Sequence, residues 1–184
     1  MANTLSKAVD LLLAFQLRET NHLIVSFPPL ACEALERLEQ LDYLLAQVQA
    51  LGLGTLEMRN DGPVNNASDP VFLSQLYTES FYFFGFRFLE IVNSRERPIP
   101  PLHGLRCDGI RNVRNRLIVH PDKKGGQGFT RSWGFSADTG PVMMPVRRLD
   151  DPTEFYDRGL YSNADELAGA ICDRLVEAIG QPSA

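Results

Sequence analysis

The sequence predicts a mainly α-helical protein: a helical bundle of one domain, residues 1–184, with a small β-hairpin before the last helix. Apolar residues recur at steps of three and four in several segments, which is the period of amphipathic helices. Clusters of Asn, Gly and Pro separate these segments. Only residues 129–146 show the alternation of a strand pair. A chain of 184 residues is long enough to bury a proper core.

The first two helices are predicted from apolar stripes at helical spacing. The first helix runs from about Thr4 to about Glu19, and its stripe comprises Leu5, Ala8, Val9, Leu12 and Phe15. Ser26 followed by two prolines indicates the second start, because proline is tolerated in the first helical turn. The second stripe comprises Ala31, Ala34, Leu38, Leu41, Leu45 and Val48. It is typical of a long helix packed against another, and Gly52 and Gly54 end it.

A loop and an aromatic-rich helix follow. The region 52–68 includes a run rich in Asn, Gly and Asp, which predicts an exposed loop whose role the sequence leaves open. Asp69 followed by proline is typical of a helix N-terminus. The helix is predicted to continue to about Asn93. Its middle, residues 81–88, is apolar nearly all round, which predicts a central buried helix.

The next segment leads to the candidate site. Residues 98–101 contain three prolines and predict an extended connector. A helix is then predicted from about Leu105 to His120, because Pro121 and two later glycines stop the helical pattern.

The period changes to two after this helix. Apolar and basic residues alternate with small or polar ones at Phe129, Arg131, Trp133 and Phe135. Turn residues at 138–141 and a return strand to Val146 complete the predicted hairpin. A final helix is predicted from about Ala164 to Ile179, with Asn163 as its N-cap, Glu166 completing a capping box, and Gly180 closing it.

Composition narrows the function classes. The formal net charge is −5, so the whole molecule is not a polycation built to coat nucleic acid. Cys32, Cys107 and Cys172 form no CxxC pair, which argues against a zinc knuckle or a redox motif. Cys32 and Cys172 are predicted to be buried small hydrophobes, in a reducing cytoplasm. The apolar run 11–17 is too short to cross a bilayer, and no cleavage site for a signal peptide follows it.

One short stretch combines residue types that suit phosphodiester chemistry. Arg114 and Asn115 precede His120 by six and five residues. On an uninterrupted helix, at about 1.5 Å per residue, the backbones of Arg114 and His120 lie roughly 9 Å apart along the axis. A guanidinium binds phosphate oxygens in a forked geometry, and an imidazole exchanges a proton near neutral pH. Asn115 offers a donor and an acceptor that can orient either group or the substrate.

The neighbouring charges agree with an anionic ligand. Nearby cations predicted to bind substrate are Arg111, Arg116, Lys123 and Lys124. An acidic protein that concentrates its cations in one segment is expected to meet an anion there. Glu79 and Glu90 are candidate inward-facing partners for Arg114 or Arg116. No cluster of metal-ligand spacing and no cofactor motif is found, so no metal and no cofactor are predicted.

A plainer interpretation of the same residues stays open. A histidine in the last turn of a helix interacts favourably with the helix dipole without any further function. Arginines on one helix often form a solvated face that pairs with acidic residues elsewhere. In that case Asn115 only hydrogen-bonds a neighbouring helix, and the segment serves a non-catalytic helical module for dimerisation or protein interaction.

The segment resembles the HEPN family. That family has an α-helical bundle with an Arg, four to six further residues and then a His, often with Asn directly after the Arg. Arg114-Asn115 and His120 fit this pattern with five intervening residues, and the similarity is specific over residues 108–122. The His-x-Tyr ending of one toxin branch is absent, since Pro121 follows the histidine. The predicted hairpin is also not part of the minimal family bundle.

The resemblance implies a function. Many HEPN proteins are metal-independent ribonucleases of toxin–antitoxin, phage-defence or RNA-processing systems, and they typically dimerise so that two motifs face one cleft. It implies RNA as the substrate, a homodimer, and an antitoxin or other protein partner. Arg114 would bind the scissile phosphate, His120 would transfer the proton, and Asn115 would orient both. The RNA 2′-hydroxyl would be the nucleophile and a cyclic phosphate the product.

Overall fold

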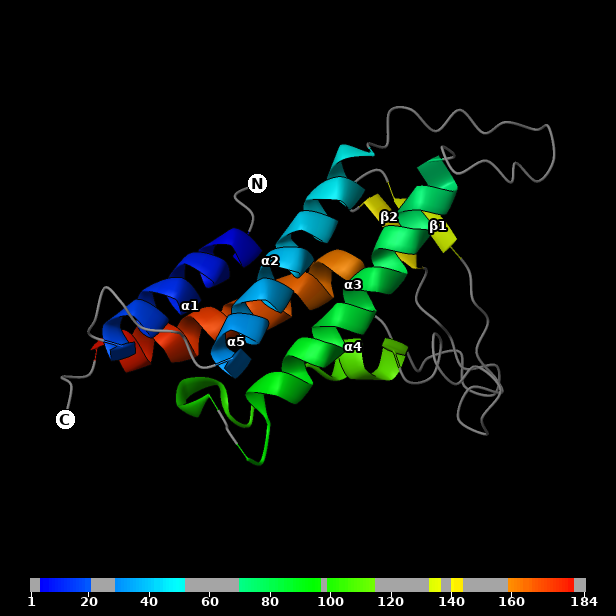
Figure 1. The fold of residues 1–184 in the computed structure, drawn as a ribbon. Coiled ribbons are helices and arrows are strands. Elements are labelled where there is room, and N and C mark those ends of the chain that lie inside the picture. Colours follow the sequence, from blue (N-terminus) through cyan, green and yellow to red (C-terminus); the bar gives the residue numbers. More distant parts are fainter. Residues whose placement is uncertain are drawn as a thin grey trace, which may run out of the picture. The chain divides into compact units, whose positions relative to one another are not determined.

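The computed structural model of the chain is mainly helical, as predicted. It describes residues 4–20, 29–51, 70–96, 99–114, 133–136, 140–143 and 159–180. The elements in chain order are α1 (Thr4–Thr20), α2 (Pro29–Ala50), α3 (Pro70–Val92), the 3-10 helix η2 (Pro100–Leu102), α4 (Asp108–Asn112), β1 (Trp133–Ser136), β2 (Gly140–Met143) and α5 (Leu160–Gly180) (Figure 1). The predicted loop 52–68 lies outside the described residues.

The chain forms two compact units. The first comprises Met1–Asp42, Phe84–Cys107 and Ala164–Ala184, and the second comprises Tyr43–Phe83 and Asp108–Asn163. Helices α2, α3 and α5 each contribute one part to either unit. The candidate site belongs to the second unit.

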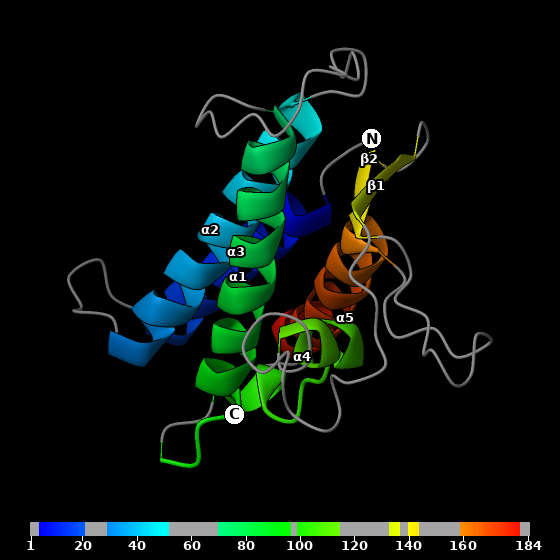
Figure 2. The same cartoon turned by 90° about the vertical axis from the view of Figure 1, so that its right-hand side faces the viewer.

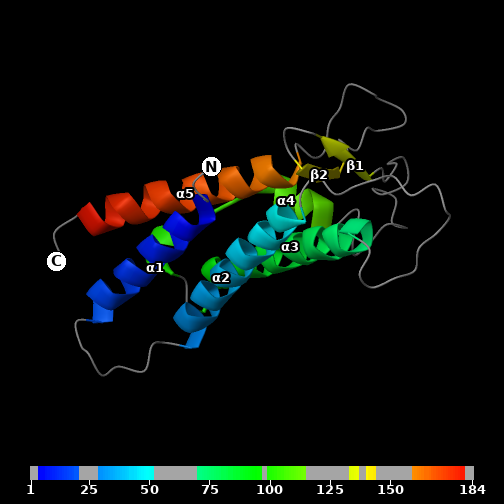
Figure 3. The same cartoon turned by 90° about the horizontal axis from the view of Figure 1, so that it is seen from above.

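In the first unit, α1 runs parallel to the C-terminal part of α5 (Figures 1 and 3). The Thr4 hydroxyl donates a hydrogen bond to Asp165 Oδ1 at 2.6 Å, and Arg18 Nη1 donates to the carbonyl oxygen of Ile179. The predicted stripe of α1 is buried at Leu5, Ala8 and Leu12. The range and the buried face of this helix are therefore confirmed.

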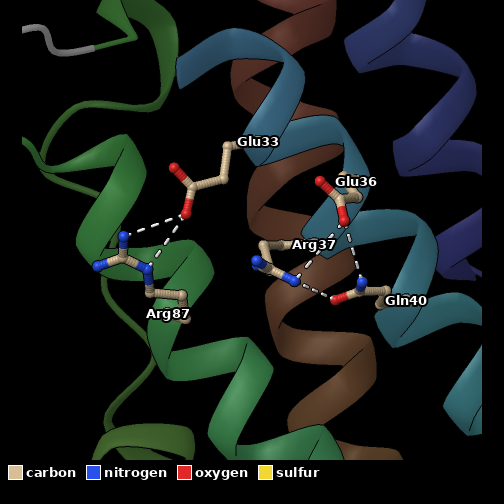
Figure 4. A network of polar contacts seen from close by, with 5 residues as sticks. All are labelled: Glu33, Glu36, Arg37, Gln40 and Arg87. Carbon is tan, nitrogen blue, oxygen red and sulfur yellow. Dashed lines mark hydrogen bonds and ion pairs between the residues drawn. The ribbon is translucent and has the colours of Figure 1, made fainter. Parts of the chain in front are cut away.

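Helices α2 and α3 also pack together in the first unit. Arg87 of α3 donates from Nε and Nη2 to Glu33 Oε1 of α2, at 3.3 and 3.1 Å (Figure 4). The Arg37 guanidinium lies over the Phe84 ring, 5.4 Å from its centre. The Arg87 side chain is 48% exposed, so this ion pair contributes little stability. The buried stripe of α2, which continues to Val48 in the second unit, stabilises the helix packing more than this exposed ion pair does.

The connector after α3 differs from the prediction. Residues 100–102 form η2 rather than an extended segment, and the N–H groups of Leu102 and His103 both donate to the Ile99 carbonyl at 2.9 Å. Proline fits the first positions of such a turn because it has no N–H to leave unpaired. Asn93 then fixes the following residues: its Nδ2 donates to the Leu105 carbonyl at 2.9 Å, and its Oδ1 accepts from the Gly104 N–H at 2.7 Å.

The aromatic-rich helix α3 is less buried than predicted. Phe81, Tyr82 and Phe88 are fully buried, but Phe83 is 49% and Leu76 46% exposed. The middle of the helix, predicted to be a central buried segment, is therefore buried on only part of its surface. An apolar residue on every face does not ensure burial, because neighbouring elements cover only part of the helix surface.

The last helix and the strands complete the chain. Helix α5 begins at Leu160 rather than Ala164, so Asn163 lies inside the helix and the predicted capping box is wrong. The Asn163 N–H donates to the Gly159 carbonyl at 3.1 Å, as in a helix interior. Strands β1 and β2 lie between 129 and 146 and pair antiparallel (Figure 2). The rest of that range lies outside the described residues. Among the described helices, none is long and apolar enough to span a membrane.

The cysteines are placed differently from the prediction. Cys107 is buried, Cys172 is partly buried and Cys32 is exposed. Cys32 lies two residues before the buried Ala34, which puts it on the opposite face of α2 at about 100° per residue. The helical pattern alone therefore did not establish burial.

We expect the three thiols to differ in reactivity. Burial raises the pKa of the Cys172 thiol, with a smaller opposing effect of Lys7, so less reactive thiolate is present at a given pH. Cys32 should react first with iodoacetamide at pH 7.5, then Cys172, and Cys107 last. Peptide mass spectrometry over time measures the order, and unfolding in urea should make the three rates similar. Faster labelling of Cys172 than of Cys32 in the folded protein would contradict this expectation.

Candidate functional site

The segment with the Arg-Asn-His motif begins as a short helix. Helix α4 spans Asp108–Asn112, so it starts three residues later than the predicted Leu105. The residues before it do not belong to the helix and make other hydrogen bonds. Arg174 Nη1 donates to the His103 carbonyl at 2.8 Å, and the Leu105 carbonyl accepts from Asn93 Nδ2. Asp108 places an acidic side chain in the first turn, where the helix dipole favours it.

Residues 113 and 114 continue α4 as a π-helical turn. Such a turn uses i→i+5 hydrogen bonds and changes the angle at which later side chains leave the helix. Residues 113 and 114 therefore depart from the α geometry that the prediction assumed, whereas the placement of Arg114 relative to His120 stays a prediction.

The structure describes two of the predicted site residues. Arg111 is exposed in the last turn of α4, and Arg114 is partly buried, with its Nε atom inside the protein. The other predicted site residues lie outside the described residues: Asn115, Arg116, His120, Lys123 and Lys124. The approach of Arg114 to His120 therefore stays a prediction.

A buried hydrogen bond of the second unit lies against α4. Asn163 is 2% exposed, and its Nδ2 donates to the Tyr82 hydroxyl at 2.9 Å. Its Oδ1 faces Gly109 of α4, where a Cβ atom would lie 2.0 Å from that oxygen. Only glycine fits this position without displacing the Asn163 amide. We call Tyr82, Gly109 and Asn163 the α4 anchor.

Apolar contacts surround this anchor. Ile110 and Val113, on α4 and the turn after it, are buried. The ring of Phe81 packs edge-on against Tyr82, with centroids 5.8 Å apart and planes at 89°, which is a favourable aromatic geometry. The segment that carries Arg114 thus begins among buried apolar side chains and next to a hydrogen-bonded amide that restricts its approach.

The sequence pattern does not indicate the α4 anchor. Tyr82 lies in a run that predicts apolar packing, Asn163 occupies a predicted N-cap position, and Gly109 belongs to no motif. A signal was present: a glycine inside a predicted helix costs about 1 kcal/mol relative to alanine, which suggests a packing reason for it. The partner of such a glycine depends on the tertiary structure.

The two candidate acidic partners of Arg114 or Arg116, Glu79 and Glu90, lie in different environments. Glu90 does not face inward, because its side chain is 48% exposed and its Oε2 lies 3.5 Å from Arg87 Nη1. Glu79 is partly buried and belongs to the second unit, as Arg114 does. Within the described ranges, no group of three or more His, Cys, Asp or Glu side chains is arranged to hold a metal ion.

Comparison with known proteins finds no match. No protein-family model, no curated protein and no solved structure matches the chain.

Proposed function

We propose that the protein is a metal-independent endoribonuclease of HEPN type, acting in a toxin–antitoxin or defence system. The observation that carries the proposal is the placement of Arg114, partly buried with its Nε inside the protein, directly after the anchored helix α4. A guanidinium in a less polar environment interacts more strongly with a phosphate than one in bulk water. The motif Arg114-Asn115…His120 and the helical architecture support the same conclusion.

The proposed chemistry is transesterification. A neutral His120 imidazole takes the proton of the RNA 2′-hydroxyl, and the 2′-oxygen forms a bond to phosphorus as the bond to the 5′-oxygen breaks. Arg114 stabilises the charge on the phosphoryl oxygens, and Asn115 orients the groups. A second imidazole, supplied by the other copy in a homodimer, protonates the leaving 5′-oxygen. The products are a 2′,3′-cyclic phosphate and a 5′-hydroxyl.

The test is RNA cleavage in the presence of EDTA. His120→Ala should lower kcat about 10²–10⁴-fold, the usual contribution of a general acid or base. His103→Ala is the matched control, because His103 is exposed and lies outside the motif. Mass spectrometry should find cyclic phosphate termini. Equal cleavage by wild type and His120→Ala, or no cleavage by either, would oppose the catalytic assignment.

The alternative proposal is a non-catalytic module for dimerisation or protein interaction. Among its described residues, the second unit exposes the large apolar side chains of Tyr43, Leu76 and Phe83, with 60%, 46% and 49% of their surface accessible. Leu76 and Phe83 are seven residues apart and therefore share one face of α3. This alternative gains support if the wild type is dimeric by light scattering, Phe83→Asp is monomeric, and neither variant nor wild type cleaves RNA.

A further inference from the structure

We propose that Tyr82 and Asn163 are positioning residues for Arg114, because their buried hydrogen bond determines where α4 lies. Neither residue belongs to the Arg-Asn-His motif. The expected effect of these residues on RNA cleavage rests on the proposed function. The position of the Arg114 side chain does not depend on that function and is measured separately.

The α4 anchor joins three elements of the second unit. Tyr82 of α3 is fully buried, Asn163 of α5 is 2% exposed, and the bond between them is 2.9 Å long. An amide buried at this depth needs partners, because an unpaired buried polar group is costly. The Tyr82 hydroxyl therefore holds the Asn163 amide in one orientation, and the amide oxygen then limits how Gly109 approaches.

Tertiary contacts decide where α4 lies, because most of the stability of a helix in a protein comes from packing rather than from its own propensity. The buried Ile110 and Val113 supply apolar packing, which is not directional. The Asn163 amide, whose orientation the Tyr82 hydroxyl fixes, leaves room only for glycine at position 109 and so limits how α4 packs against it. Arg114 follows five residues later on the same segment.

The direct test observes Arg114 without any RNA. Its Nε atom is buried, which slows exchange of the Nε proton with water and makes its resonance observable in arginine labelled with ¹⁵N. Arg114→Lys assigns the resonance. Asn163→Ala and Tyr82→Phe should shift or broaden it. Ser162→Ala, which changes the exposed neighbour of Asn163, should leave it unchanged.

The resonance of Arg37, whose Nε atom is also buried, reports whether each variant is folded. Tyr82→Phe keeps the ring and removes only the hydroxyl, so it tests the hydrogen bond even if Asn163→Ala unfolds. An Arg114 resonance that stays in place in folded Tyr82→Phe and Asn163→Ala would overturn the positioning role.

The kinetic test separates this inference from the proposed function. In EDTA, Tyr82→Phe and Asn163→Ala should lower kcat about 10–100-fold, as for a misplaced catalytic group, with a much smaller change in KM. Ser162→Ala should match the wild type. If the wild type does not cleave RNA, the proposed function fails while the Arg114 resonance still decides the positioning. If the wild type cleaves and both anchor variants keep its kcat, the positioning role is wrong.

Discussion

Replacing Gly109 with alanine is expected to lower the free energy of unfolding by about 1–3 kcal/mol, the usual cost of overpacking a core site. The added Cβ would lie 2.0 Å from Asn163 Oδ1 and 2.7 Å from its Cγ. Asn163 cannot turn away at low cost, because its Nδ2 is bonded to the buried Tyr82 hydroxyl. Urea denaturation followed by circular dichroism measures the change.

Two further variants make this prediction sharp. Gly169→Ala on α5 is the matched control. Within the described part of the chain, no atom outside the backbone of its own helix lies within 4 Å of the added Cβ, so the better helix propensity of alanine should raise stability by about 0.5–1 kcal/mol. Gly109→Ala should also cost less in an Asn163→Ala background, where the clashing amide is gone. If Gly109→Ala is as stable as the wild type, the close approach described for α4 is incorrect.

Replacing Arg114 with alanine is expected to lower kcat/KM for RNA about 10²–10³-fold, the usual cost of losing one donor to transition-state charge. Arg114→Lys should restore little of this activity, because lysine lacks the planar fork that binds two phosphate oxygens. Steady-state cleavage of a fluorogenic RNA in EDTA measures the effect. The salt concentration is kept constant, because electrostatic affinity for nucleic acid depends on it.

Two other arginines serve as controls for Arg114. Arg87→Ala removes an exposed arginine that pairs with Glu33, and it should keep the activity of the wild type. Arg111→Ala removes an exposed cation of α4 and should mainly raise KM and reduce the salt dependence of binding. If Arg114→Ala is as active as Arg87→Ala, Arg114 is not a phosphate ligand, and the interaction-module alternative gains support.

The sequence alone predicted the helices that depend on local periodicity. The range of α1 and its buried Leu5, Ala8 and Leu12 agree with the prediction, as does the stripe of α2. These features follow from the spacing of apolar residues, which each helix carries within itself. The identity of the candidate cations also came from the sequence, since residue type and charge are local properties. The placement of His120 stays a prediction.

The tertiary structure decided what each polar or ambiguous residue does. Asn163 has the sequence features of an N-cap, but the buried Tyr82 hydroxyl lies within hydrogen-bond distance, and α5 starts earlier. Phe83 and Cys32 are exposed because helix neighbours do not cover their faces. Asn163 has its partner on a segment distant in the chain, and the burial of Phe83 or Cys32 would likewise require a distant segment to cover it. A local sequence pattern does not show which distant segments come together. The spacing of apolar residues along the sequence determined which segments form the long helices. Packing between segments distant in the chain determined where Gly109 lies, and with it the segment of Arg114.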